Sequence, residues 1–237
     1  MPDRRSFLSR SAAFVAAAGL GGCTDINQTE WWPRFLGSAD AVNKWVERLF
    51  AGGWSLAREY SKADITPAFR ANGTTSPGTD RYNALAANGF ADWRLTVNGL
   101  VERPLSLSLA QLRAMPARTQ ITRHDCVEGW SCIGEWTGVQ LARVLAMASP
   151  RPEARYCVFY CMDPMDTGGL TQTFYYETLD LVESMHPQTL LAYAMNGENL
   201  PIPHGAPVRV RAERQLGYKQ PKYVERVELV ASYWLLV

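Results

Sequence analysis

Residues 121–139 read ITRHDCVEGWSCIGEWTGV, and the order of elements expected for the chain depends on this stretch. Ile121 and Arg123 alternate with Thr122, which suits a strand with two different faces. The alternation ends at Cys126, and an apolar wall follows it: Trp130, Ile133 and Trp136. After Gly138 the apolar residues recur at helical spacing, which predicts a helix over residues 139–147.

Cys126 has two interpretations. Free cysteines are among the most buried residue types, so a packed small hydrophobe is the ordinary one. Three ionisable residues surround it, however: His124, Asp125 and Glu128. A core strand rarely tolerates so many charged groups beside a buried thiol. These neighbours favour a thiolate that binds a metal.

The segment CVEGWS at residues 126–131, with the aromatic stretch and glycine turn behind it, closely resembles the cofactor loop of the sulfite oxidase family of molybdenum enzymes. The similarity continues through residues 186–210 and 214–224, and it is closest to the periplasmic branch of methionine-sulfoxide reductases. The resemblance implies a molybdopterin-dependent oxidoreductase. It also implies that Cys126 is the one protein ligand to molybdenum, which is carried on a molybdopterin.

The fold class follows from the pattern of elements. Strands outnumber helices, and short hairpins alternate with single helices, which predicts an α+β domain. A chain of 237 residues, 47% of them hydrophobic, can bury one sizeable core. The resemblance implies a mixed sulfite-oxidase-type molybdopterin-binding fold. We expect a single domain at residues 61–237, preceded by a tether and N-terminal helices at residues 24–60.

The N-terminus reads as a targeting segment. Residues 4–8, RRSFL, form a twin-arginine pattern, and residues 12–20 are weakly apolar. We therefore expect residues 1–23 to be a twin-arginine export signal that directs the protein to the periplasm. The sequence LGGC, which ends at Cys23, resembles a lipoprotein processing box. Lipid attachment at Cys23, which would anchor the protein to a membrane, and simple cleavage nearby both remain open.

Several local signals predict turns and helix ends. Alternation toward Asn-Gly at residues 98–99 predicts a tight hairpin. Ser108 predicts the N-cap of a short helix that ends at Pro116. Residues 163–169 read as a turn-rich loop and residues 178–185 as a short helix.

The resemblance implies a cofactor site drawn from several segments of the chain. Its candidate residues are Phe69, Arg70, Asn72, Cys126, Cys161, His204, Arg209, Gly217, Tyr218, Lys219 and Lys222. The pterin's phosphate needs cations such as Arg209 and outward-pointing amides such as those of the turn after Leu216. Cys161 stands where the methionine-sulfoxide-reductase branch has a small hydroxyl residue. Arg211 faces the same way as Arg209, and we interpret it as part of a solvated basic strand.

Charge bears on the substrate and the partner. Net charge is +1 without a basic stripe, so nucleic-acid binding is not indicated. Glu128 would oppose an anion at the metal, which favours reduction of a small neutral S-oxide or N-oxide over sulfite oxidation. The chain has no C-x-x-C-H haem motif. A single molybdenum centre then needs a membrane cytochrome or a soluble redox protein as electron partner.

Two alternatives differ from this hypothesis in kind. The first is a zinc site made from His124, Asp125, Cys126 and Cys132, although their spacing is irregular. The second is an exported lipoprotein that kept the fold and lost the metal. The presence of Cys126 argues against the second alternative.

Overall fold

The computed structural model describes residues 54–165 and 173–232, together with isolated positions between residues 29 and 49. The expected export signal at residues 1–23, with Cys23, lies outside the described residues, as do residues 166–169 of the predicted loop. The chain divides into two compact units, Met1–Gly53 and Trp54–Val237. The second unit includes residues 54–60, which the sequence analysis assigns to the extension. Among the described residues, no helix is both long and apolar enough to span a bilayer.

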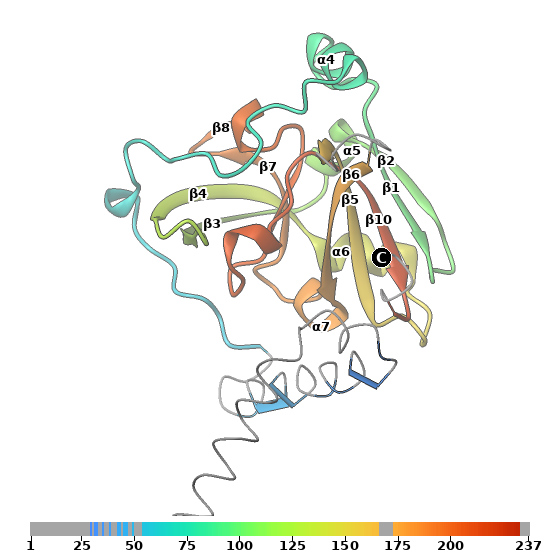
Figure 1. Ribbon diagram of the computed structural model, residues 1–237. Coiled ribbons are helices and arrows are strands. Elements are labelled where there is room, and N and C mark those ends of the chain that lie inside the picture. Colours follow the sequence, from blue (N-terminus) through green and yellow to red (C-terminus); the bar gives the residue numbers. More distant parts are fainter. Residues whose placement is uncertain are drawn as a thin grey trace, which may run out of the picture. The chain divides into compact units, whose positions relative to one another are not determined.

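Two five-stranded sheets form the second unit (Figure 1). The first has the order β2-β1-β10-β5-β6, whose bounds are Leu105–Ser108, Arg94–Gly99, Val224–Val230, Tyr156–Met165 and Thr173–Asp180. The second has the order β3-β4-β7-β8, whose bounds are Ala117–Asp125, Ser131–Gln140, Leu190–Met195 and Glu198–Asn199. Strand β9, Arg209–Arg211, adds to β7. All pairs are antiparallel except β1 with β10, which confirms a mixed, sheet-dominated α+β fold.

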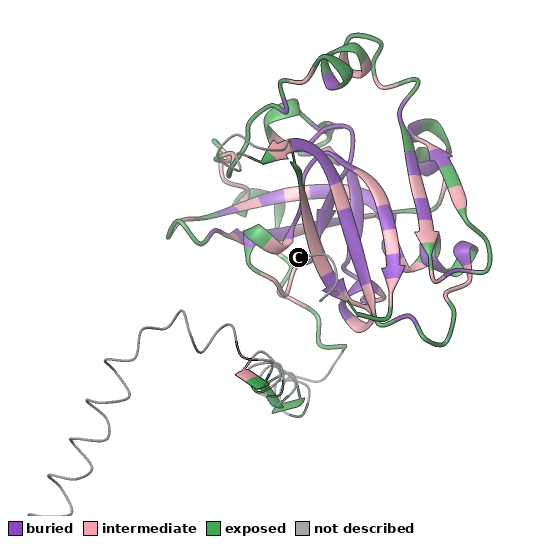
Figure 2. Ribbon diagram, turned by 45° about the vertical axis from the view of Figure 1, so that its right-hand side comes forward, coloured by how far each residue is buried: buried purple, intermediate pink, exposed green. Residues whose placement is uncertain are grey.

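The described helices of this unit are short. They are α4 Asp80–Ala87, α5 Leu109–Ala114, α6 Leu141–Ala148 and α7 Leu181–Ser184, with 3₁₀ turns η1 Lys62–Asp64, η2 Ile202–His204 and η3 Gly217–Lys219. Ser108 caps α5 as predicted, because its side chain accepts a hydrogen bond from the Gln111 amide at 3.1 Å. Figure 2 shows buried residues concentrated in the central strands.

The core has a large and a small part. The large part packs the first sheet against α5 and α6, and it includes Leu95, Val97 and Phe159. The small part is Trp136, Ala192, Met195 and Leu200, with Phe69 packed against it. Gly138 lets β4 approach β7 closely, since a Cβ there would lie 2.2 Å from the Leu191 carbonyl oxygen. The small part lies under the segments that build the site.

Three local predictions were wrong, and a fourth placed the start of a helix two residues too early. Gly99 does not close a tight hairpin, because it pairs in parallel with Leu229 and β2 starts only at Leu105. Residues 178–180 belong to β6, and α7 starts after Asp180, whose side chain accepts a hydrogen bond from the Glu183 amide at 2.9 Å. Residues 163–165 are the end of β5 instead of a loop. The helix predicted from residue 139 begins two residues later because Val139 still pairs with Leu191.

Candidate cofactor site

A cleft opens where the end of β3 faces η3. Its volume is about 210 Å³, which is smaller than the roughly 300–1,000 Å³ usual for small-molecule sites. Residues from five segments line it: Asn72, Gly73, Thr74, Cys126, Val127, Glu128, Asp163, Tyr175, Gly217, Tyr218, Gln220, Pro221 and Lys222. Four segments named in the sequence analysis therefore meet here: 72–74, 126–128, 163 and 217–222.

Cys126 stands directly after β3, in a tight turn. Its amide donates to the Trp130 carbonyl at 2.9 Å, and Gly129 donates back to its carbonyl at 3.1 Å. Gly129 adopts φ +85°, a conformation that suits glycine. The thiol is a free cysteine, the residue is 9% exposed, and it belongs to neither part of the apolar core. Cys126 is thus sheltered yet faces the cleft.

His124 lies below this turn and is fully buried. Its Nδ1 atom is 2.9 Å from an Nη atom of Arg211. A guanidinium can only donate, so Nδ1 accepts and the proton of the neutral ring is on Nε2. Burial lowers the pKa of His124 to about 2, and the charges of Arg211 and Arg209 act in the same direction. A Cβ at Gly217 would lie 2.5 Å from Nε2, so only glycine fits above the ring.

Arg211 is buried, not part of a solvated strand as predicted. Its guanidinium binds both carboxylate oxygens of Glu213, at 3.0 and 2.6 Å, and both side chains are 0% exposed. Gln120 donates to the same carboxylate at 2.8 Å. The guanidinium also lies 4.3 Å from the centre of the Trp136 ring. The sequence analysis missed this arrangement because the partners come from β3, β4 and the segment after β9.

Arg209 lies on the same strand, and its hydrogen bonds go to backbone carbonyls. It donates to the carbonyls of His204, at 3.1 Å, and Gln220, at 3.2 Å, while its Nε atom has no partner. Burial lowers its pKa to about 9, which still leaves it charged at neutral pH. Burial also lowers the pKa of His204 to about 4, and its Nδ1 atom is unpartnered.

Lys222 joins three segments at the inner end of the cleft. Its ammonium donates to the carbonyls of Asn72 at 2.7 Å, of Pro203 at 3.0 Å and of Thr74. Burial and the charge of Arg209 lower its pKa to about 8. Asp163 lies across from it, with an unpartnered, buried Oδ1 atom and a pKa that burial raises.

Two predicted cations lie at the rim. Arg70 is exposed, lies 5.4 Å from the centre of the Trp130 ring and is 3.7 Å from the Glu128 carboxylate. Lys219 donates to Glu177 at 2.6 Å and does not line the cleft. Its neighbour Tyr218 does line it.

The remaining candidates stand behind the cleft. Phe69 packs against the rings of Trp136, His124 and His204, at 5.4, 5.8 and 5.6 Å between centroids. Cys161 belongs to the large part of the core and does not line the cleft. Sequence reasoning did not assign Asp163, Tyr175 or Gln220 to the site, and it did not find the support from His124, because these roles depend on contacts between segments far apart in the chain.

Buried polar atoms around the cleft lack partners, and they fall into two kinds. Acceptor oxygens without a partner belong to Asn72, Asp163 and Gln220, and donor nitrogens without a partner belong to Arg209 and His124. Buried polar atoms are ordinarily satisfied. The unpartnered oxygens line the cleft and therefore fit a ligand that offers N–H donors, whereas the nitrogens of Arg209 and His124 lie behind the cleft wall.

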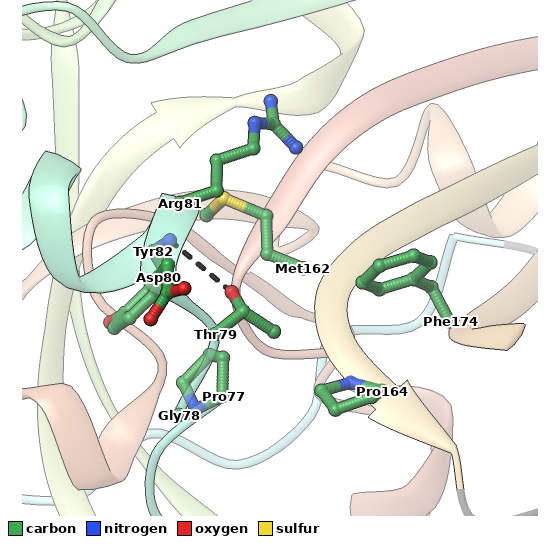
Figure 3. A pocket seen from close by; sticks show the side chains of 9 residues that line it. All are labelled: Pro77, Gly78, Thr79, Asp80, Arg81, Tyr82, Met162, Pro164 and Phe174. Atoms are coloured by element: carbon green, nitrogen blue, oxygen red, sulfur yellow. Dashed lines mark hydrogen bonds between the residues drawn. The ribbon is translucent and has the colours of Figure 1, made fainter. Parts of the chain in front are cut away.

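A second cavity lies beside α4 and the far end of β5 (Figure 3). Its walls include Thr79, Met162 and Phe174, and none of the predicted site residues lines it. In the parts of the chain that the structure describes, no three His, Cys, Asp or Glu side chains converge on a metal position. The zinc alternative therefore has no support from the described residues.

Comparison with known proteins agrees with this geometry. The family described as "Oxidoreductase molybdopterin binding domain" matches residues 83–234. The putative protein-methionine-sulfoxide reductase subunit YedZ1 of Azospira oryzae is 34% identical over 98% of this chain and 83% of its own length. The protein-methionine-sulfoxide reductase catalytic subunit MsrP of Xanthomonas campestris pv. campestris is 37% identical over 96% of this chain and 70% of its own.

A solved structure shows a related fold. The sulfane dehydrogenase SoxCD from Paracoccus pantotrophus superposes with a TM-score of 0.53 at 25% identity. The match covers 60% of this chain and 39% of that chain.

Proposed function

Because the chain belongs to the family of oxidoreductases with a molybdopterin-binding domain, we propose that it reduces an S-oxide at a cofactor held in the Cys126 cleft. The chain is a molybdopterin-dependent oxidoreductase, and its relatives include methionine-sulfoxide reductase catalytic subunits. The reaction direction, the substrate and the role of each residue are the proposal. One observation carries it: a sheltered thiol shares a cleft with the unpartnered acceptor oxygens of Asn72, Asp163 and Gln220.

The residues present fit a molybdopterin. Cys126 would bind the molybdenum, since a thiolate is a soft ligand that suits such a site. Arg209 and Lys222 would neutralise the phosphate. The unpartnered oxygens of Asn72 and Asp163 would accept hydrogen bonds from pterin N–H groups. These assignments satisfy atoms that the protein alone leaves without partners.

When bound, the molybdopterin supplies two-electron chemistry with transfer of an oxygen atom. The protein residues then have to bind, orient and deliver protons. Asp163 would orient the cofactor through its unpartnered Oδ1 atom, and burial raises the pKa of its carboxyl group. Lys222 and its three carbonyl partners fix segment 72–74 against the loop after η3. The turn from Cys126 to Trp130 holds the thiol at the cleft wall.

The charges near the mouth favour a neutral substrate. Three cations close to it are matched by carboxylates: Arg70 with Glu128 at 3.7 Å, Arg123 with Asp125 at 3.0 Å and Lys219 with Glu177 at 2.6 Å. A sulfite ion would meet neutralised charges there. An S-oxide is neutral, so its binding does not depend on an unpaired positive charge at the mouth.

Apolar side chains beside the mouth suit a sulfoxide that is part of a polypeptide. Val127 is 62% exposed, and Leu216 and Tyr218 are each 48% exposed. Exposed apolar groups that cluster at a site commonly mark a binding surface. Methionine sulfoxide in a protein would offer a neutral oxide to the cleft and adjoining apolar side chains to this surface. The relatives are named as reductases of that substrate.

We also propose a periplasmic location and an electron partner. The twin-arginine pattern at residues 4–8 supports export of an already loaded protein. The relatives are named as subunits, which supports a partner subunit that delivers electrons. A membrane cytochrome or a soluble redox protein would fill that role.

A dye-linked assay of the holoenzyme tests the function. With a reduced dye as donor, we expect turnover of protein-bound and free methionine sulfoxide, and with an oxidised dye as acceptor we expect little turnover of sulfite. A Glu128→Gln variant should improve sulfite turnover more than sulfoxide turnover, whereas Glu102→Gln, a matched change at the exposed pair with Arg151, should alter neither. Sulfite oxidation that exceeds reduction of every S-oxide and N-oxide tested would overturn the proposal.

A further inference from the structure

A buried polar network runs beneath the Cys126 turn. Gln120, His124 and Arg211 are all buried, and Glu213 joins them through its fully buried side chain. Gln120 also donates to the carbonyl of Gln188 at 3.0 Å. Every link is a hydrogen bond between side chains or to a carbonyl, so the network is continuous from β3 through the end of β9.

The network fixes the charge state and tautomer of one ring. Glu213 neutralises Arg211 and holds its guanidinium in a bidentate pair. The remaining Nη atom of Arg211 donates to Nδ1 of His124 at 2.9 Å. The His124 proton is thereby confined to Nε2. The same pair keeps Arg211 occupied, whereas Arg209 on the same strand keeps an unpartnered Nε atom.

His124 also connects the two sides of the cleft. It stands two residues before Cys126 on β3, and Gly217 at the start of η3 rests on its ring. A Cβ on Gly217 would lie 2.5 Å from Nε2, 2.6 Å from Cε1 and 3.4 Å from the Asp125 carbonyl oxygen. Any tilt of the imidazole would therefore move the glycine turn relative to the thiol.

We propose that His124 is a positioning residue for the cofactor, which sets the separation between the Cys126 thiol and the Gly217–Lys219 turn. Arg211 and Glu213 hold the ring in place from the side away from the cleft. The inference rests on the proposed function, because it assumes that the cofactor is bound between Cys126 and η3. Groups that hold a metal-site residue in position ordinarily change affinity by about tenfold or more when they are removed.

The experiment compares loaded variants of the full chain. The double variant Arg211→Met/Glu213→Leu removes the ion pair and fills the space with apolar groups, an exchange that folded proteins often tolerate. His124→Ala removes the ring, and His124→Gln keeps one N–H donor. The matched control is Arg226→Met/Glu228→Leu, which removes a 3.0 Å pair on β10 in the other sheet.

Two readouts separate positioning from general stability. The first is the rate at which pterin fluorescence appears as cofactor leaves the protein, and the second is the electron paramagnetic resonance spectrum of Mo(V). We expect release to be about tenfold faster in the double variant and in His124→Ala, with a shifted spectrum. We expect partial rescue in His124→Gln and wild-type behaviour in the control. Melting temperatures of the apo forms identify any variant that fails to fold.

The possible outcomes are distinguishable. A loaded wild type together with unchanged release and spectra in both the double variant and His124→Ala overturns this inference alone. Equal changes in the control overturn it as well, since the effect would then be general. A wild type that contains no molybdenum overturns the proposed function first.

Discussion

At the level of single residues, Gly217 leaves no space for a side chain. A Cβ there would overlap the His124 ring, with 2.5 Å to Nε2. We predict that Gly217→Ala lowers cofactor content of the wild-type chain but has much less effect in a His124→Ala background. The reason is that removing the ring opens the space that the methyl group needs. A double-mutant cycle on cofactor content measures this, and strictly additive effects would contradict the contact.

Sequence reasoning reached some of these residues and not others. Cys126 could be found because the strand pattern ends there beside three ionisable residues. Arg209 and Lys222 were found only through the family resemblance, and Arg211 was misinterpreted. A strand residue's burial depends on what packs over it. Arg211 is buried because it binds Glu213 and His124. The spacing of polar and apolar residues does not show that the Glu213 side chain, two residues later, is buried beside it.

Residues 54–60, which we call the strap, form one extended segment that is hydrogen-bonded to the second sheet. Gln188 accepts from the Ala57 amide at 2.7 Å and donates to the Ala57 carbonyl at 3.0 Å. The Tyr60 amide donates to Ile121 at 2.8 Å. The strap therefore pairs with β3, the strand that leads to Cys126.

We predict that Gln188→Met loosens this strap. The loss of both hydrogen bonds to Ala57 should cost about 1–3 kcal/mol of unfolding free energy and speed amide hydrogen exchange in residues 54–60. Hydrogen exchange followed by mass spectrometry checks the local effect. Gln111→Met, a change at the exposed cap of α5, serves as control, and equal exchange in the strap of both variants would refute the role of Gln188.

The elements predicted correctly are those whose signals are local. Ser108 caps α5, and the strands around Cys126 have the alternation expected of them. The hairpin predicted at Asn98–Gly99 is present but not tight: β1 and β2 pair antiparallel, with Val97 opposite Leu105. Gly99 stays in the sheet opposite Leu229, and residues 100–104 make the connection.

At the scale of the whole molecule, the three histidines contribute to the response of stability to acid. Each of the three, His124, His186 and His204, has a pKa below 6.5 in the folded state, chiefly because of burial. Above pH 6.5 they are neutral in both states. Below it the unfolded chain takes up protons that the native rings resist, so the free energy of unfolding should fall. The raised pKa of Asp163 acts oppositely, since it favours the native state at lower pH.

Unfolding of the apo protein by denaturant at a series of pH values tests this. We predict a loss of stability as the pH falls from 6.5 toward 4, where His204 itself becomes protonated in the native state. His204→Gln should flatten that slope. A stability that stays constant or rises over this range in the wild type would contradict the expected proton balance.

The central claim is that the Cys126 sulfur binds molybdenum. Molybdenum X-ray absorption of the holo wild type and of Cys126→Ser tests it most directly, with the metal content of both measured in parallel. We predict one Mo–S contact fewer in the variant, together with loss of S-oxide reduction. The same number of Mo–S contacts in both proteins would contradict the claim, whatever the activity.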